Sequence, residues 1–98
     1  MARNPAPVRP DLIDAVLALK SRAEAEAFLI DLCTPREIEA LSERWQVARL
    51  LDAGELSYRD IAQQAKSSTA TVVRVARFLK DMPHRGYRRV LDRLAEAR

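Results

Sequence analysis

The residues best suited to chemistry in this 98-residue sequence are arginines, which concentrate in its second half. Arginine outnumbers lysine fourteen to three, and residues 58–93 contain nine basic and three acidic side chains. A guanidinium group donates paired hydrogen bonds to phosphate oxygens or to the major-groove edge of guanine. This charge suits a nucleic-acid surface, although a solvated helix face accounts for it equally well.

Residue types for catalysis or metal binding are scarce. His84 is the only histidine and follows Pro83 in a predicted turn, and Cys33 is the only cysteine. A catalytic histidine requires an orienting partner in a pocket, and a zinc site requires several Cys or His ligands. We therefore predict no enzyme activity, no metal and no cofactor. We interpret Cys33 as a buried apolar residue rather than a redox sensor.

The sequence also bears on the cellular compartment. The longest uninterrupted apolar run, Ala15–Leu19, has five residues, whereas a membrane-spanning helix needs about 20. No apolar segment of a secretory signal follows Arg3, and a single cysteine cannot form an internal disulfide. These features favour a cytoplasmic protein that does not insert into a membrane.

The elements that must position the arginines are predicted to be helices. Glycine occurs only twice and good helix formers are abundant, which favours an all-α fold of one domain. Ser21 with Glu24 and Thr34 with Glu37 have the spacing of capping boxes, and Gly54 is suited to end a helix. We expect a flexible arm at residues 1–10 and one domain at residues 11–98. Its helices are expected at about 11–20, 22–32, 35–53, 58–65, 69–80 and 87–97.

Residues 58–79 have the pattern of a helix-turn-helix, with a short helix, a polar turn and a longer helix. Ala62 and Ala65 supply small side chains where the two helices cross, and Val72 and Val75 supply branched ones. The predicted exposed face of the second helix carries Thr69, Thr71, Arg74 and Arg77. This pattern favours DNA binding, and the alternative is an ordinary helical hairpin with a charged face.

Two residues bear on the backbone around this motif. Lys66 opens the predicted turn, at a position where many such turns carry glycine because the residue adopts a positive φ. A lysine there departs from the usual pattern. Gly86 is expected to let the chain turn before the last helix.

Four short motifs stand between residues 34 and 74. They read TP-x-E-x-x-AL from Thr34, RWQVARLL from Arg44, GE-x-S-x-R from Gly54 and AT-x-x-R from Ala70. With these motifs, residues 12–95 or so resemble the Trp repressor family, and most closely its YerC/YecD group. The resemblance implies an all-α fold of six helices, an interlocked homodimer and a DNA-reading helix-turn-helix at about 58–80.

The resemblance also implies which residues contact DNA. Positions that match DNA-contacting residues of the family are Tyr58, Arg59, Ala62, Thr69, Ala70, Thr71, Val73, Arg77 and Lys80. Four of them suit phosphates, namely Arg59, Thr71, Arg77 and Lys80. The methyl groups of Thr69, Ala70 and Val73 suit base edges, where they can meet thymine.

The implied function is that of a bacterial transcription regulator, a repressor, that binds specific sequences of double-stranded DNA as a homodimer. The composition agrees with a dimer, because apolar residues make up 48% of the chain but sixteen of them are alanine. A monomer would have a thin core, and oligomerisation is one remedy for a small domain. The alternative is an all-α dimeric interaction module that keeps the fold without reading DNA.

The family's tryptophan site is only partly present. Arg44 and Arg74 match the arginine pair that holds tryptophan in the repressor, and Thr34 matches a further residue of that pocket. Val75 and Phe78 stand where the repressor keeps small residues, and they would fill the slot for the indole ring. We therefore expect that tryptophan is not the effector, which stays unknown. The arginine pair then serves dimer packing, phosphate contacts or another anion.

Overall fold

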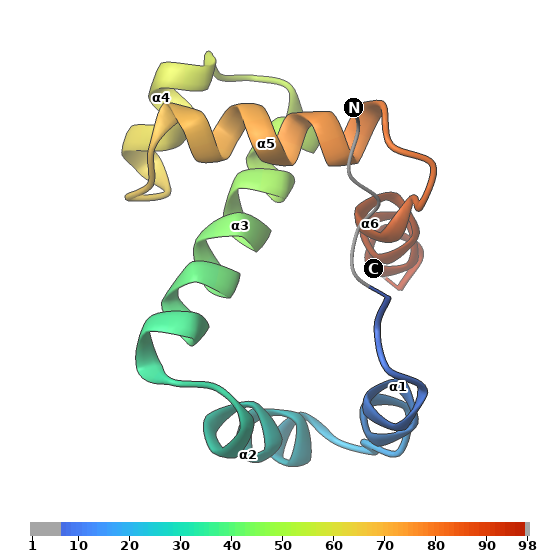
Figure 1. Ribbon diagram of the computed structural model, residues 1–98. Helices are drawn as coiled ribbons and strands as arrows, with labels where there is room; N and C mark the ends of the chain where they lie inside the picture. The colour runs from blue at the N-terminus through green and yellow to red at the C-terminus, as the bar shows by residue number, and fades with distance from the viewer. Residues whose placement is uncertain (1–6, 98) are drawn as a thin grey trace. The chain divides into compact units, whose positions relative to one another are not determined.

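The computed structural model describes residues 7–97 and contains six α-helices and no strand over that range. Their order along the chain can be followed in Figure 1. Their bounds are α1 Pro10–Leu17, α2 Arg22–Leu32, α3 Pro35–Ala53, α4 Tyr58–Gln64, α5 Thr69–Lys80 and α6 Gly86–Glu96. The predicted all-α fold of six helices is confirmed. Within the described residues, no helix combines the length and the apolar character that crossing a membrane requires.

Hydrogen bonds in their first turns explain why α2 and α3 begin where the sequence predicts. The Ser21 hydroxyl oxygen accepts a hydrogen bond from the Glu24 backbone N–H at 3.1 Å. At α3 the exchange is reciprocal: the Glu37 N–H donates to the Thr34 hydroxyl at 3.1 Å, and the Glu37 carboxylate accepts from the Thr34 N–H at 2.8 Å. These bonds satisfy backbone donors that a helix start leaves unpaired. Hydrogen bonding to the backbone of Thr34, and then to its side chain, holds the pKa of Glu37 below its ordinary value.

Two helix ends differ from the prediction. The first helix ends at Leu17 rather than at Lys20, because the Lys20 N–H already donates to the Glu24 carboxylate at 3.1 Å and so belongs to the start of α2. The turn expected at Gly86 lies one residue earlier. Arg85 adopts the left-handed conformation with φ 59°, and Gly86 is the first residue of α6.

The chain divides into two compact units, Met1–Ile38 and Glu39–Arg98. Of the predicted arm, residues 1–6 lie outside the described residues, and Pro10 already belongs to α1. No residue between 7 and 38 is buried, and Cys33, expected to be buried, is half-buried. Large apolar side chains exposed on α1 and α2 are Leu12, Ile13, Val16, Leu17, Leu29, Ile30 and Leu32. The single domain at residues 11–98 stays a prediction, because the chain divides into two units and residues 7–38 contain no buried core.

The second unit has a core where α3, α4 and α5 meet (Figure 1). Its buried residues are Val47, Ala48, Leu51, Ile61, Ala62, Ala65, Val72, Val75 and Ala76. Trp45 and Tyr87 are among the partly buried residues that pack against this core. Arg88 ties α6 to α3, because its guanidinium donates to the Asp52 carboxylate at 2.8 Å and pairs with Asp92 at 2.8 Å. The core and this ion pair fix α4, α5 and α6 relative to the end of α3.

Candidate nucleic-acid interface

The helix-turn-helix predicted at about 58–80 is formed by α4 and α5, which are joined by residues 65–68. The turn is tight, because the Ser67 N–H donates to the Ala62 carbonyl at 2.8 Å and the Lys66 N–H to the Gln63 carbonyl at 3.2 Å. Lys66 has φ 55°, so the position does require the left-handed conformation. Lys66 adopts this conformation, although glycine would adopt it without steric cost.

The packing of α4 on α5 follows the predicted division into small and branched residues. Ile61, Val72 and Val75 are fully buried, and Ala62 lies beside them with 5% of its surface exposed. Ala62 was predicted both to face the helix crossing and to match a DNA-contacting position. Its burial agrees with the first of these and leaves almost no side-chain surface to offer DNA. We therefore leave Ala62 out of the candidate interface.

The first turn of α5 is organised by Ser68. Its hydroxyl oxygen accepts from the Thr71 N–H at 3.1 Å, and the hydroxyl donates to the Thr71 hydroxyl oxygen at 3.0 Å. Thr71 is half-buried, whereas its neighbours Thr69 and Ala70 are exposed. A hydroxyl that accepts one hydrogen bond can also donate one, so the Thr71 hydroxyl can donate to an acceptor such as a phosphate oxygen.

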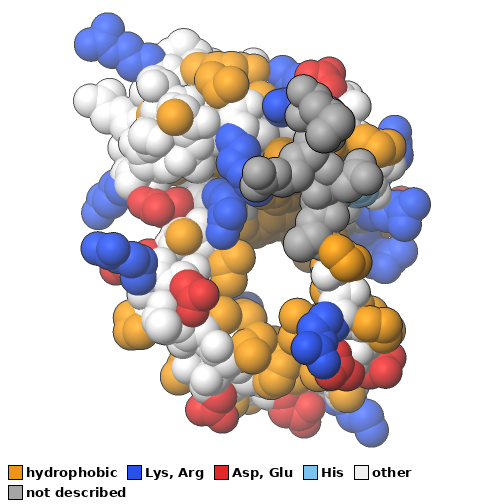
Figure 2. All heavy atoms as spheres, in the orientation of Figure 1, with side chains coloured by type: hydrophobic (Ala, Val, Ile, Leu, Met, Phe, Trp, Pro, Cys, Tyr) orange, Lys and Arg blue, Asp and Glu red, His pale blue; other side chains and the backbone are white. Residues whose placement is uncertain are grey.

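The outward face of α5 changes character along its length. Its exposed residues are Thr69, Ala70, Val73, Arg74, Arg77 and Lys80. With about 3.6 residues per turn, the residues of one outward stripe are Thr69, Val73, Arg77 and Lys80. We call these four the α5 stripe: its first half carries methyl groups and its second half carries cations. Figure 2 shows Lys and Arg side chains over the part of the molecule that contains α4 and α5.

Two residues from opposite ends of the motif meet on its surface. The Lys80 Nζ lies 5.9 Å from the centroid of the Tyr58 ring, in the geometry of a cation–π contact. Tyr58 and the neighbouring Arg59 are both exposed. The contact brings the last residue of α5 to the first residue of α4. Sequence reasoning proposed these residues separately and missed the contact, since they stand 22 positions apart.

Of the three residues predicted for an effector pocket, Arg74 and Thr34 each make a contact within their own unit. The Arg74 guanidinium lies 4.7 Å from the centroid of the Phe78 ring. Arg44 is half-buried on α3. Thr34 belongs to the first unit, where it caps α3. Val75 is fully buried in the core.

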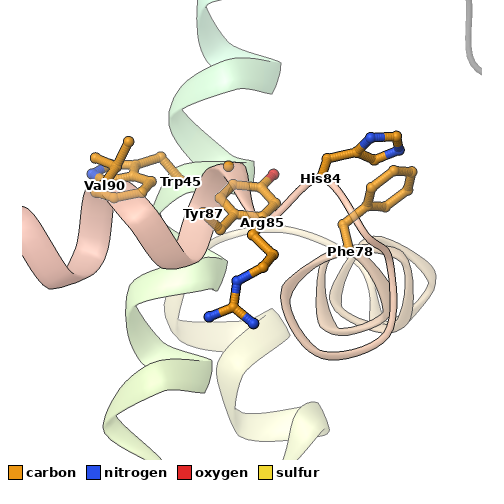
Figure 3. A pocket seen from close by; sticks show the side chains of 7 residues that line it. Trp45, Phe78, His84, Arg85, Tyr87 and Val90 are labelled. Carbon is orange, nitrogen blue, oxygen red and sulfur yellow. The ribbon is translucent and has the colours of Figure 1, made fainter.

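A cleft of about 490 Å³ lies between α3, the end of α5 and the start of α6 (Figure 3). It is lined by Trp45, Phe78, His84, Arg85, Gly86, Tyr87 and Val90. The Trp45 and Tyr87 rings stack with centroids 6.4 Å apart. A second cleft of about 370 Å³ separates α3 from α6. Among the described residues, Thr34, Arg44 and Arg74 line neither cleft.

Comparison with known proteins bears on the whole chain. The family model described as Trp repressor protein matches residues 10–95. The uncharacterized protein YerC of Bacillus subtilis (strain 168) is 40% identical over 85 residues, which cover 87% of this chain and 80% of YerC. The crystal structure of a TrpR like protein from Eubacterium eligens ATCC 27750 has a TM-score of 0.79 and 44% identity, over 87% of this chain and 86% of that one. A structure from Staphylococcus aureus has the same TM-score with 41% identity, over 87% and 83% of the two chains.

These matches agree with each other and with the fold. The family model covers all six helices except the last residue of α6. YerC and both solved structures are 40–44% identical to this chain over 87% of its length. The resemblance seen in the sequence motifs is thereby confirmed. The chain belongs to the Trp repressor family.

Proposed function

We propose that this protein is a sequence-specific DNA-binding transcription regulator, a repressor, that acts as a homodimer through α4 and α5. The α5 stripe carries the proposal, because it presents methyl groups and then cations on one exposed helix face. A helix-turn-helix places such a helix in the major groove with its N-terminal residues at the base edges. Membership of the Trp repressor family supports the same function.

Phosphate contacts would come from both helices. Arg59 at the start of α4 and Arg77 on α5 are exposed cations. Lys80 joins them beside the Tyr58 ring, and the Thr71 hydroxyl supplies a neutral donor. Contacts of this kind set the position of a protein on the duplex without reading its sequence.

The dimer is supported by the apolar surface that a single chain leaves open. The first unit exposes seven large apolar side chains on α1 and α2. The second unit exposes Val90 and Leu94, which line its two clefts. Exposed apolar surface in this amount is typical of an interaction site, and a second copy of the chain would offer apolar faces of the same kind. The second copy also brings a second reading head, which a palindromic operator requires.

Selection of bound duplexes from a random DNA pool at about 100 mM salt tests the proposal. We expect a palindrome whose half-sites are centred about one helical turn apart. Affinity for that duplex should fall steeply with salt, because each neutralised phosphate releases counterions. Enrichment of no duplex would contradict the proposal. It would favour the alternative, an interaction module that shows no retardation of DNA at this salt.

We further propose that free tryptophan is not the corepressor. Val75 fills the core where an indole slot would need a small residue, and the half-buried Phe78 lies under the Arg74 guanidinium. Calorimetry with millimolar L-tryptophan should show no saturable heat, and DNA affinity should not change when tryptophan is added. A tryptophan-dependent rise of about tenfold, or about 1.4 kcal/mol of coupling, would contradict this.

A further inference from the structure

We propose that Lys66, in the turn between α4 and α5, binds a DNA phosphate on one side of the major groove, opposite a phosphate bound by Lys80. The inference rests on the proposed function in DNA binding and adds a residue that the family resemblance does not assign. It starts from an unusual backbone conformation. Lys66 has φ 55° and is one of two described residues other than glycine in the left-handed region.

The folded chain itself gives Lys66 no evident reason to be a lysine. A Cβ atom makes the left-handed conformation unfavourable, and asparagine or aspartate can offset this with local hydrogen bonds. A lysine ammonium has no acceptor for a backbone N–H. The Lys66 side chain is exposed, and the ion pairs formed among the described residues do not include it. Backbone strain of this kind is concentrated at functional sites, so the side chain is expected to serve a binding partner.

The charge around Lys66 indicates an anionic partner. Residues 61–80 contain four lysines or arginines and no aspartate or glutamate. Lys66 is the one of these four that precedes α5, whereas Arg74, Arg77 and Lys80 follow the first turn of that helix. A lysine ammonium is a compact point charge on a flexible stem, and it binds phosphate oxygens without a fixed direction of approach.

The turn holds the backbone of Lys66 in a fixed place relative to α5. Directly after it, the Ser67 N–H donates to the Ala62 carbonyl at 2.8 Å. One residue later Ser68 caps the start of α5. Lys66 therefore extends from the end of the motif at which a recognition helix meets the bases, and Lys80 extends from the opposite end of α5.

The length of α5 suits contacts with both DNA strands. Its twelve residues span about 18 Å at a rise of 1.5 Å per residue, and the major groove is about 12 Å wide. With α5 in the groove, ammonium groups at its two ends can reach phosphates on opposite strands. Two such anchors position the helix in the groove without reading the sequence.

The variant Lys66→Gly tests the inference by separating stability from DNA affinity. Glycine adopts the left-handed backbone freely and removes the ammonium, so Tm should not fall. Affinity for the duplex selected by the intact protein should nevertheless fall about eightfold at about 100 mM salt. One phosphate contact accounts for this, because it changes log affinity by about 0.9 for each tenfold change in salt. The slope of log affinity against log salt should fall by about one.

Two further variants control for backbone and for charge. Arg85→Gly is the matched control, because Arg85 is also an exposed cation with φ 59° but lies outside α4 and α5. It should retain the affinity and the salt slope of the unchanged protein. Lys66→Arg keeps the charge and should also retain the slope. An equal loss in Lys66→Gly and Arg85→Gly would assign the effect to net charge and overturn the inference.

Neutral linkages in the duplex identify the phosphates. In the selected duplex, one phosphate at a time is replaced by an uncharged methylphosphonate. In each half-site, Lys66→Gly should become insensitive to replacement of one phosphate that the unchanged protein requires. Lys80→Ala should become insensitive at a phosphate on the opposite strand. The same phosphate for both variants, or none for Lys66→Gly, would overturn the inference.

The outcomes also separate this inference from the proposed function. If the protein selects a duplex and Lys66→Gly binds it with unchanged affinity and slope, the inference is wrong and the DNA-binding function stands. If no duplex is selected at all, the proposed function has failed, and the inference fails with it.

Discussion

Among the described residues, two that are not glycine adopt the left-handed backbone conformation. Lys66 has φ 55° and Arg85 has φ 59°, whereas the glycine that ends α3, Gly54, has φ 71°. The sequence predicted the special position of Lys66, because the turn of a helix-turn-helix has a fixed place relative to its helices. It did not predict Arg85, since the local sequence suggested Gly86 instead. Long-range packing, such as the stacking of Tyr87 on Trp45, fixes where α6 begins and is not written in the neighbouring residues.

Replacing Lys66 by glycine should stabilise the protein. A side chain in the left-handed region destabilises the fold by roughly 1–2 kcal/mol, and glycine removes this strain. Glycine also makes the unfolded chain more flexible, which lowers stability by roughly 0.5–1 kcal/mol. The net gain should be roughly 0–1.5 kcal/mol, and each 1 kcal/mol raises Tm by about 4–8 °C in a domain of this size. Lys66→Ala is the control, because it removes the same charge and keeps the Cβ atom. Equal Tm values for the two variants would mean that the left-handed backbone costs no more than the entropy that glycine adds to the unfolded chain, about 0.5–1 kcal/mol.

Lys80 gives a prediction about DNA rather than about stability. Lys80→Ala should weaken binding to all duplexes alike and lower the slope of log affinity against log salt by about one. Lys80 lies beside the Tyr58 ring. In the proposed complex its ammonium neutralises one phosphate, which carries no base identity. Binding isotherms at several salt concentrations measure this, with Lys20→Ala as the control, since Lys20 is also exposed but lies in the first unit. A changed preference among duplexes would assign Lys80 to the bases instead.

At the scale of helices, the sequence predicted the boundaries that depend on neighbouring residues. It did not predict features that depend on residues far apart in the chain. The bounds of α2 and α3 follow from Ser21 and Thr34, whose partners lie three residues away. The helix-turn-helix was also predictable, because its small and branched residues have a fixed spacing. The cleft beside Trp45 was not, since its lining comes from three separate segments. The effector pocket predicted from the resemblance relied on residues in different units, so one chain does not test it.

The start of α3 should be sensitive to acid. Thr34 lowers the pKa of Glu37 in the folded protein, so the ionised carboxylate stabilises the folded state above its unfolded pKa. That contribution is lost as the pH falls through the folded pKa, because the carboxyl is then protonated in both states. Glu37→Gln should therefore be less stable than the unchanged protein at pH 7, and the difference should shrink towards pH 3. Urea unfolding at both pH values measures it, and a difference independent of pH would contradict the role of the charge.

At the scale of the whole molecule, the described part of the first unit, residues 7–38, has no core and the second unit has one. The sequence predicted a thin core from its many alanines, and the described residues agree, since none between 7 and 38 is buried. Apolar periodicity identified the stripes of α1 and α2 but does not say which surface covers them. In the proposed dimer that surface belongs to the second chain, which a pattern within one chain does not identify.

The proposed dimer makes stability depend on protein concentration. Sedimentation at micromolar concentration should give about twice the chain mass, and Tm should rise with concentration. Leu17 is 77% exposed on α1, so Leu17→Glu should weaken the dimer by about 3 kcal/mol over its two copies. Val73→Glu, at an exposed apolar residue of the reading head, should leave the mass unchanged. A folded monomer of the unchanged protein at micromolar concentration would contradict the dimer.

The division of the chain at Ile38 and Glu39 also has a genetic consequence. The exposed apolar residues of α1 and α2 lie in one unit and α4 and α5 in the other. In the proposed dimer, a damaged reading head would therefore leave the first unit able to pair. In a cell with equal amounts of intact and head-damaged chains, random pairing leaves about a quarter of the dimers with two working heads. Substitutions of the exposed residues of α5 should therefore be dominant over the intact allele, whereas substitutions that prevent pairing should be recessive.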